Sequence, residues 1–164
     1  MPLESVLMFL FTPALWPALL AFLALATPLA IKDAREFRLP LPLNLGLLGS
    51  ALVLLPIASI WTGAGPLLTA AITGGVVTVL LLGLFILARG GLGFGDVILG
   101  TGLGLYGGFV SPLALLAGLW IGCLGTLIWA VLRKRRGVRG SVPFGPGLIL
   151  GTALVLVVPV PGLT

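Results

Sequence analysis

The chain has 164 residues, of which 59% are hydrophobic and 8% charged, with a mean hydropathy of +1.29 and a net charge of +5. This composition is too apolar for a soluble domain of that size and predicts an integral membrane protein. One cysteine, Cys123, and no histidine exclude an internal disulfide and metal sites built from Cys and His. Nucleic-acid binding is not indicated, because every basic residue lies next to an apolar segment, where basic residues fix topology.

Six apolar segments predict an all-α, polytopic membrane protein with six transmembrane helices. In chain order they cover residues 6–31, 43–61, 66–88, 97–110, 112–132 and 146–160. The first lacks the basic start of a cleavable signal peptide and is long enough to span the membrane. The second contains Pro56, which predicts a kink. The fourth, at about 14 residues, reaches only about 21 Å against a hydrocarbon core of roughly 30 Å.

The basic residues support this count of six, because they all fall in alternate connections between the segments. The first, third and fifth connections hold Lys32, Arg35 and Arg38, then Arg89, then Arg133, Lys134, Arg135, Arg136 and Arg139. By the positive-inside rule these connections are cytoplasmic and both termini lie outside, which we expect to apply in a cytoplasmic membrane. The last cluster also fits contact with anionic lipid.

Three of the four acidic residues lie at the predicted cytoplasmic ends of segments: Asp33, Glu36 and Asp96. Asp96 opens the short fourth segment, so either the bilayer thins there or this carboxylate lies below the interface. Two carboxylates on different helices, facing one cavity, suit an aspartic peptidase. One ionised group takes a proton from water while its protonated neighbour polarises the peptide carbonyl. Such chemistry needs no metal, cofactor or nucleophilic side chain.

Three motifs also resemble a family, the type IV prepilin peptidases, which are GxGD-type membrane aspartic peptidases. One is Asp33 with Arg35 soon after it and Pro40 several positions on. Another is Gly93-Phe94-Gly95-Asp96, which leads into a glycine-rich helix. The third is Pro143-Phe144-Gly145-Pro146 ahead of the last segment. Together they span most of the chain in the family's order.

The resemblance implies a single transmembrane peptidase domain over residues 1–164, with Asp33 and Asp96 as the catalytic pair. Gly93, Gly95 and Pro143–Pro146 match its positioning motifs. The implied reaction removes the basic leader from type IV prepilins or prepilin-like proteins at the cytoplasmic face. Many members carry a cysteine-containing cytoplasmic insertion associated with methyl transfer, and the first connection has no room for one. We therefore expect no N-methyltransferase activity. Ile98 stands where the family usually has lysine.

Structural interpretations of the same residues remain open. Asp96 can simply cap a helix, and Asp33 can pair with Lys32 or Arg35 at the interface. Glu36 is a rival for the second carboxylate, since it lies about one helical turn beyond Asp33. Pro143–Pro146 can be only a turn that starts a helix, or it can line the substrate path.

Two further functions are alternatives. One is a small transporter or proton-conducting subunit that uses the intramembrane carboxylates as a relay. The spans offer little beyond hydroxyl groups to continue such a relay. The other is a catalytically silent homologue.

Overall fold

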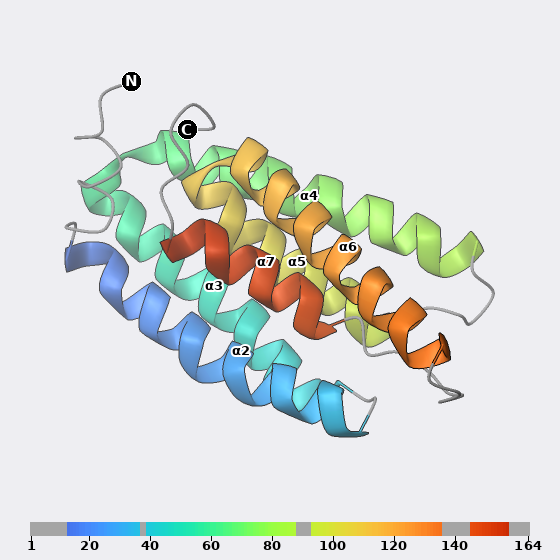
Figure 1. Ribbon diagram of the computed structural model, residues 1–164. Helices are drawn as coiled ribbons and strands as arrows, with labels where there is room; N and C mark the ends of the chain where they lie inside the picture. The colour runs from blue at the N-terminus through green and yellow to red at the C-terminus, as the bar shows by residue number, and fades with distance from the viewer. Residues whose placement is uncertain (1–12, 37–38, 88–92, 136–144, 158–164) are drawn as a thin grey trace.

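Helices make up nearly all of the described chain. The computed structural model describes residues 13–36, 39–87, 93–135 and 145–157, of which 96% are helical. A short 3-10 turn, η1 (Pro13–Leu15), precedes six α-helices (Figure 1). They are α2 (Trp16–Glu36), α3 (Leu41–Thr62), α4 (Ala64–Leu87), α5 (Phe94–Val110), α6 (Pro112–Arg135) and α7 (Gly145–Val157). The prediction of an all-helical fold is confirmed for these residues.

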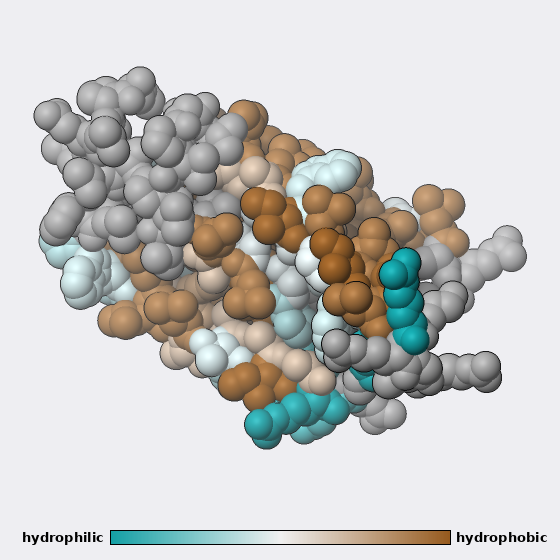
Figure 2. Space-filling model, viewed as in Figure 1, coloured by the Kyte–Doolittle hydropathy of each residue, from teal (hydrophilic) through white to brown (hydrophobic). Residues whose placement is uncertain are grey.

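Four of these helices are long and apolar enough to cross a membrane. They are Pro13–Glu36, Leu41–Thr62, Ala64–Leu87 and Pro112–Arg133. Large apolar side chains cover the flanks of the molecule, and the strongly hydrophilic side chains gather toward one end in Figure 2. The protein is therefore membrane-embedded and multi-pass. Helices α5 and α7 are apolar but shorter, and α5 with 17 residues is about 25 Å long.

Helix α5 lies at the centre of the bundle, where it contacts α3, α4, α6 and α7. Most of its residues are buried, and many of these are glycine. A Cβ added at Gly100, Gly104 or Gly108 would run into α4, so this face packs backbone against backbone or side chain without a gap. The glycines of α5 let this helix fit closely between the helices that surround it.

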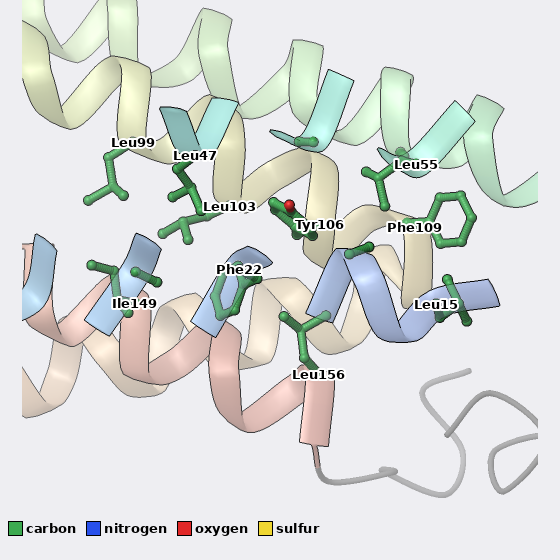
Figure 3. Packing of buried hydrophobic residues seen from close by; sticks show 14 of the residues in the cluster. Leu15, Phe22, Leu47, Leu55, Leu99, Leu103, Tyr106, Phe109, Ile149 and Leu156 are labelled. Carbon is green, nitrogen blue, oxygen red and sulfur yellow. The ribbon is translucent and has the colours of Figure 1, made fainter. Parts of the chain in front are cut away.

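Aromatic and aliphatic side chains from α2, α3, α5 and α7 form the core around this helix (Figure 3). Phe22 of α2 meets Tyr106 of α5 edge to face, with ring centroids 5.1 Å apart. The Tyr106 hydroxyl lies 2.8 Å from the Ser50 hydroxyl on α3 and is thereby satisfied inside the bundle. The middle of the bundle is thus a packed core with paired polar groups.

The buried stripes of α2 and α3 each end in a polar residue. Positions three or four apart share one helix face, and this spacing relates the buried residues of each helix. On α2 they are Ala18, Phe22, Ala26, Leu29 and Asp33. On α3 they are Asn44, Leu47, Ala51, Leu55 and Ala58. Since α2 ends where α3 begins, Asp33 and Asn44 face inward at the same end of the bundle.

Two helices extend past the predicted apolar spans at this end. Helix α2 continues beyond residue 31 to Glu36, because no glycine or proline interrupts residues 32–36. Helix α5 begins at Phe94, three residues ahead of the span 97–110. Asp96 therefore lies within the first turn of the helix, where its side chain can bond the exposed N–H groups.

Candidate active site

Asp33 is a buried carboxylate held by a distant part of the chain. Its residue is 5% exposed, and its Oδ2 accepts a 2.9 Å hydrogen bond from the backbone N–H of Gly145. Gly145 is the first residue of α7, where the helix leaves N–H groups without partners of their own. The positive end of the α7 dipole also favours a negative charge there. The α7 N-terminus therefore holds this carboxylate in place.

Asp96 is held within its own helix turn. Its Oδ2 accepts a 3.2 Å hydrogen bond from the backbone N–H of Gly93, the residue before α5. The Asp96 N–H in turn donates to the Gly93 carbonyl, 3.0 Å away. Asp96 therefore does cap the helix, as one interpretation of the sequence held, while it remains partly exposed. A capping carboxylate at a solvated edge remains available for proton transfer.

The two aspartates lie at the same end of the bundle, where Asp33 contacts the start of α7 and Asp96 lies in the first turn of α5. Leu39, in the connection between α2 and α3, packs between the two helix starts that hold them. Its side chain lies within 3.4 Å of the positions that a Cβ would take on Gly95 and on Gly145. The N-termini of α5 and α7 therefore approach each other near the C-terminal end of α2. Figure 1 shows these three helix ends on the same side of the bundle.

Asn44 is a site residue that the sequence analysis missed. It is fully buried, and its Nδ2 donates a 2.6 Å hydrogen bond to the carbonyl of Gly95. Its Oδ1 is buried and accepts no hydrogen bond from the described residues. Because the carbonyl can only accept, the amide nitrogen must face it, which fixes the orientation of the amide. The signal in the sequence was a polar residue on the apolar stripe of α3.

The other charged residues on α2 differ from Asp33 in exposure. Glu36, the last residue of α2, is exposed, whereas Asp33 is buried. Lys32 and Arg35 are also exposed, and in the described chain Asp33 takes its hydrogen bond from Gly145 rather than from either of them.

The motif residues divide into described and undescribed ones. Pro143 and Phe144 lie outside the described residues. Gly93 and Gly95 lie at the start of α5, Gly145 donates to Asp33, and Pro146 lines a groove next to it. The last motif is therefore more than a helix start, because its glycine contacts the buried carboxylate.

This arrangement suits proton transfer between two carboxylates in different surroundings. Within the described ranges no group of three His, Cys, Asp or Glu side chains is placed to hold a metal ion. No protein-family model matches the chain, and neither does a curated protein or a solved structure. The chemistry of the site must therefore be argued from its own residues.

Proposed function

We propose that the protein is a membrane aspartic endopeptidase that removes the basic leader of prepilins or prepilin-like proteins. The observation that carries the proposal is that two of the few carboxylates in the chain lie at the same end of the bundle. Asp33 and Asp96 come from different helices, and the helix starts that bond them both pack against Leu39. The motifs around them resemble those of the type IV prepilin peptidases.

In the proposed reaction one aspartate is ionised and the other is protonated. The ionised carboxylate accepts a proton from water as the water oxygen attacks the peptide carbonyl carbon. The protonated carboxyl donates a hydrogen bond and then its proton to the carbonyl oxygen. As the tetrahedral intermediate collapses, the C–N bond breaks and the leaving amine takes the proton that the first carboxylate gained from water. The second carboxylate recovers its proton from a hydroxyl of the intermediate, which becomes the product carboxyl, and the pair returns to its starting state. Two like charges at short range favour a shared single proton, which is the state this sequence of steps requires.

The proposed topology has six spans, with the aspartates at the cytoplasmic face and both termini outside. Four helices have the length and composition of spans, and α5 and α7 complete the count if the bilayer is thin around them. In support, the exposed basic residues Lys32, Arg35 and Arg135 belong to the C-terminal ends of α2 and α6. Figure 1 shows these two helix ends on the same side of the bundle as the starts of α5 and α7. With its aspartates on the cytoplasmic side, the enzyme would reach the leader peptide of its substrate while the leader is still in the cytoplasm.

The test is cleavage by the detergent-purified protein of a panel of prepilin-like substrates, with the products identified by intact mass. Wild type, Asp33→Asn and Asp96→Asn are compared, with Glu36→Gln as the control that removes an exposed carboxylate. We expect one cut at the leader junction, slowed by about 10²- to 10⁴-fold in both Asp variants and unchanged in the control. Full activity in either Asp variant would disprove the assignment. The product should carry an unmethylated N-terminus.

The transporter alternative is weakened by how the buried hydroxyl groups are paired. Thr101 lies 2.7 Å from Thr78, and Tyr106 lies 2.8 Å from Ser50. These hydroxyl groups hydrogen-bond to each other in separate pairs between α5 and the neighbouring helices. Within the described residues they do not form a chain of hydrogen bonds that starts at Asp96. Proton flux into sealed vesicles that contain the purified protein measures this alternative directly. Flux without cleavage would favour the transporter, and neither activity would favour a silent homologue.

A further inference from the structure

An apolar groove of about 580 Å³ runs between α6 and α7 on the outside of the bundle. Its sides include Trp129 of α6 and Leu150 of α7, and Gly122, Gly125 and Gly147 contribute to its floor. Along α7 it extends from Pro146 to Leu154, which is about 12 Å of helix or a little over two turns.

The groove is hollow because the two helices meet through glycine. A Cβ on Gly122 would collide with the Gly147 carbonyl, and one on Gly151 with the Gly118 carbonyl. The backbones therefore touch at the floor, where the small Thr126 side chain lies against Gly147. Gly125 differs from these glycines, since a Cβ added there would meet nothing within 4 Å. It is exposed and opens directly into the groove.

One end of the groove adjoins the aspartate site. Ala34, which directly follows Asp33, lines this end, and so does Pro146, which directly follows Gly145. These are the two residues joined by the hydrogen bond that holds Asp33. This end of the groove therefore lies beside the two backbone segments that carry Asp33 and its hydrogen-bond donor.

We propose that this groove receives the apolar helix of the substrate, an inference that rests on the proposed peptidase function. Such a substrate has a basic leader followed by an apolar membrane helix. That helix, lying along α6 and α7 in the membrane, continues into its leader at the end of the groove where Asp33 lies. Exposed glycine allows its backbone to approach closely, and the flanking apolar side chains pack against its turns. The groove thereby sets how far the cut lies from the start of the helix.

The first test fills the groove without disturbing the bundle. Gly125→Trp places a large side chain in open space, and Gly75→Trp is its matched control. Gly75 is an exposed glycine on α4 with nothing within 4 Å of its Cβ position. Each variant is assayed on a full-length substrate and on a short peptide that contains the leader junction but no apolar helix.

For Gly125→Trp we expect KM for the full-length substrate to rise about tenfold, with cleavage of the short peptide unchanged. The control should leave both substrates unchanged. Unaltered cleavage of the full-length substrate by Gly125→Trp would overturn the proposal. So would an equal loss on both substrates, because the substitution would then act on the aspartate site rather than on docking.

A second measurement does not depend on catalysis or on the Trp variant. The photo-crosslinking amino acid p-benzoylphenylalanine is placed at Leu150, which is 68% exposed in the groove, or at Val79, which is 70% exposed on α4. Crosslinking of uncleaved full-length substrate from position 150 and not from position 79 is expected. Crosslinks to lipid alone, or equal substrate crosslinking at both positions, would overturn the proposal. If the wild type cleaves nothing, the peptidase assignment fails, and this measurement still decides the groove.

Discussion

Asp33 is buried and takes its hydrogen bond from Gly145, 112 positions away in the chain, whereas Asp96 is partly exposed and takes its bond from Gly93, three positions away. One carboxylate is therefore held by tertiary packing and the other by a local helix cap. Anything that moves α7 disturbs the first, while the second depends on the first turn of α5. This difference predicts that the two aspartates tolerate changes around them very unequally.

The sharpest test places one methyl group beside each aspartate. In Gly145→Ala the new Cβ would lie 2.7 Å from Asp33 Oδ2 and 3.4 Å from Leu39, so the short carboxylate side chain must move. We expect cleavage to fall about 10²-fold, since an error of about 1 Å at a catalytic group has that effect. The measurement is kcat/KM on the substrate that the wild type cleaves.

The control for this variant is Gly75→Ala, where the methyl group meets nothing within 4 Å. It should cleave like wild type. Near-normal activity in Gly145→Ala would mean that the α7 contact does not position Asp33, and the comparison between the two aspartates would lose its basis.

A smaller effect is expected from Asn44→Leu, which removes the hydrogen bond to the Gly95 carbonyl at the start of α5. We expect kcat to fall about fivefold with KM nearly constant, as one hydrogen bond is worth about 1 kcal/mol. Thermal stability should change little, because the substitution also removes the buried Oδ1 that has no partner among the described residues. Equal losses of kcat and stability would make Asn44 a packing residue only.

Gly93→Ala should have a weaker effect than Gly145→Ala. The backbone at Gly93 has φ −78° and ψ 143°, which any residue adopts, and a Cβ there would lie 3.3 Å from Asp96 Oδ2. Because this carboxylate is partly exposed, it can shift by a few tenths of an ångström. We expect a loss of about threefold in kcat/KM, well below that of Gly145→Ala. A larger loss than in Gly145→Ala would reverse the comparison.

The least effect is expected from Glu36→Gln, for which the cleavage rate is measured as a function of pH. In the wild type, Asp33 and Asp96 together should give a bell-shaped pH–rate profile. The rate falls at low pH because both aspartates are protonated and no base remains, and it falls at high pH because no acid remains. Glu36 is exposed, so solvent screens its charge. At every pH, the cleavage rate of Glu36→Gln should therefore lie within about twofold of the wild-type rate. Loss of one limb of the bell in this variant would make Glu36 a member of the pair.

Local signals in the sequence predicted the helices and the environment of Asp96 well. Apolar runs and their glycine or proline boundaries located the six helices, and Gly93-Phe94-Gly95-Asp96 indicated a cap. The start of α5 was placed three residues late, because the cap lets Asp96 lie inside the helix rather than ahead of it. Such features depend on neighbours within a few residues, which the sequence displays directly.

The tertiary part of the site was harder to predict. The contact between Asp33 and Gly145 joins distant segments, and no local pattern in the sequence specifies it. Asn44 was missed because its partner, the Gly95 carbonyl, is backbone and leaves no mark in the sequence. The groove likewise depends on which glycines of α6 and α7 meet. The stripe of α3, however, would have identified Asn44 as an inward-facing polar residue.

Helix α7 belongs to both the groove and the aspartate site, since Pro146 lines the first and Gly145 holds Asp33 in the second. If a substrate helix docks against α7 as proposed, docking and the charge state of Asp33 are coupled through this helix. By thermodynamic linkage, if docking changes the proton affinity of Asp33 by some factor, protonation of Asp33 changes the docking affinity by the same factor. The affinity of the groove would then depend on pH, although the side chains that line it are almost entirely apolar.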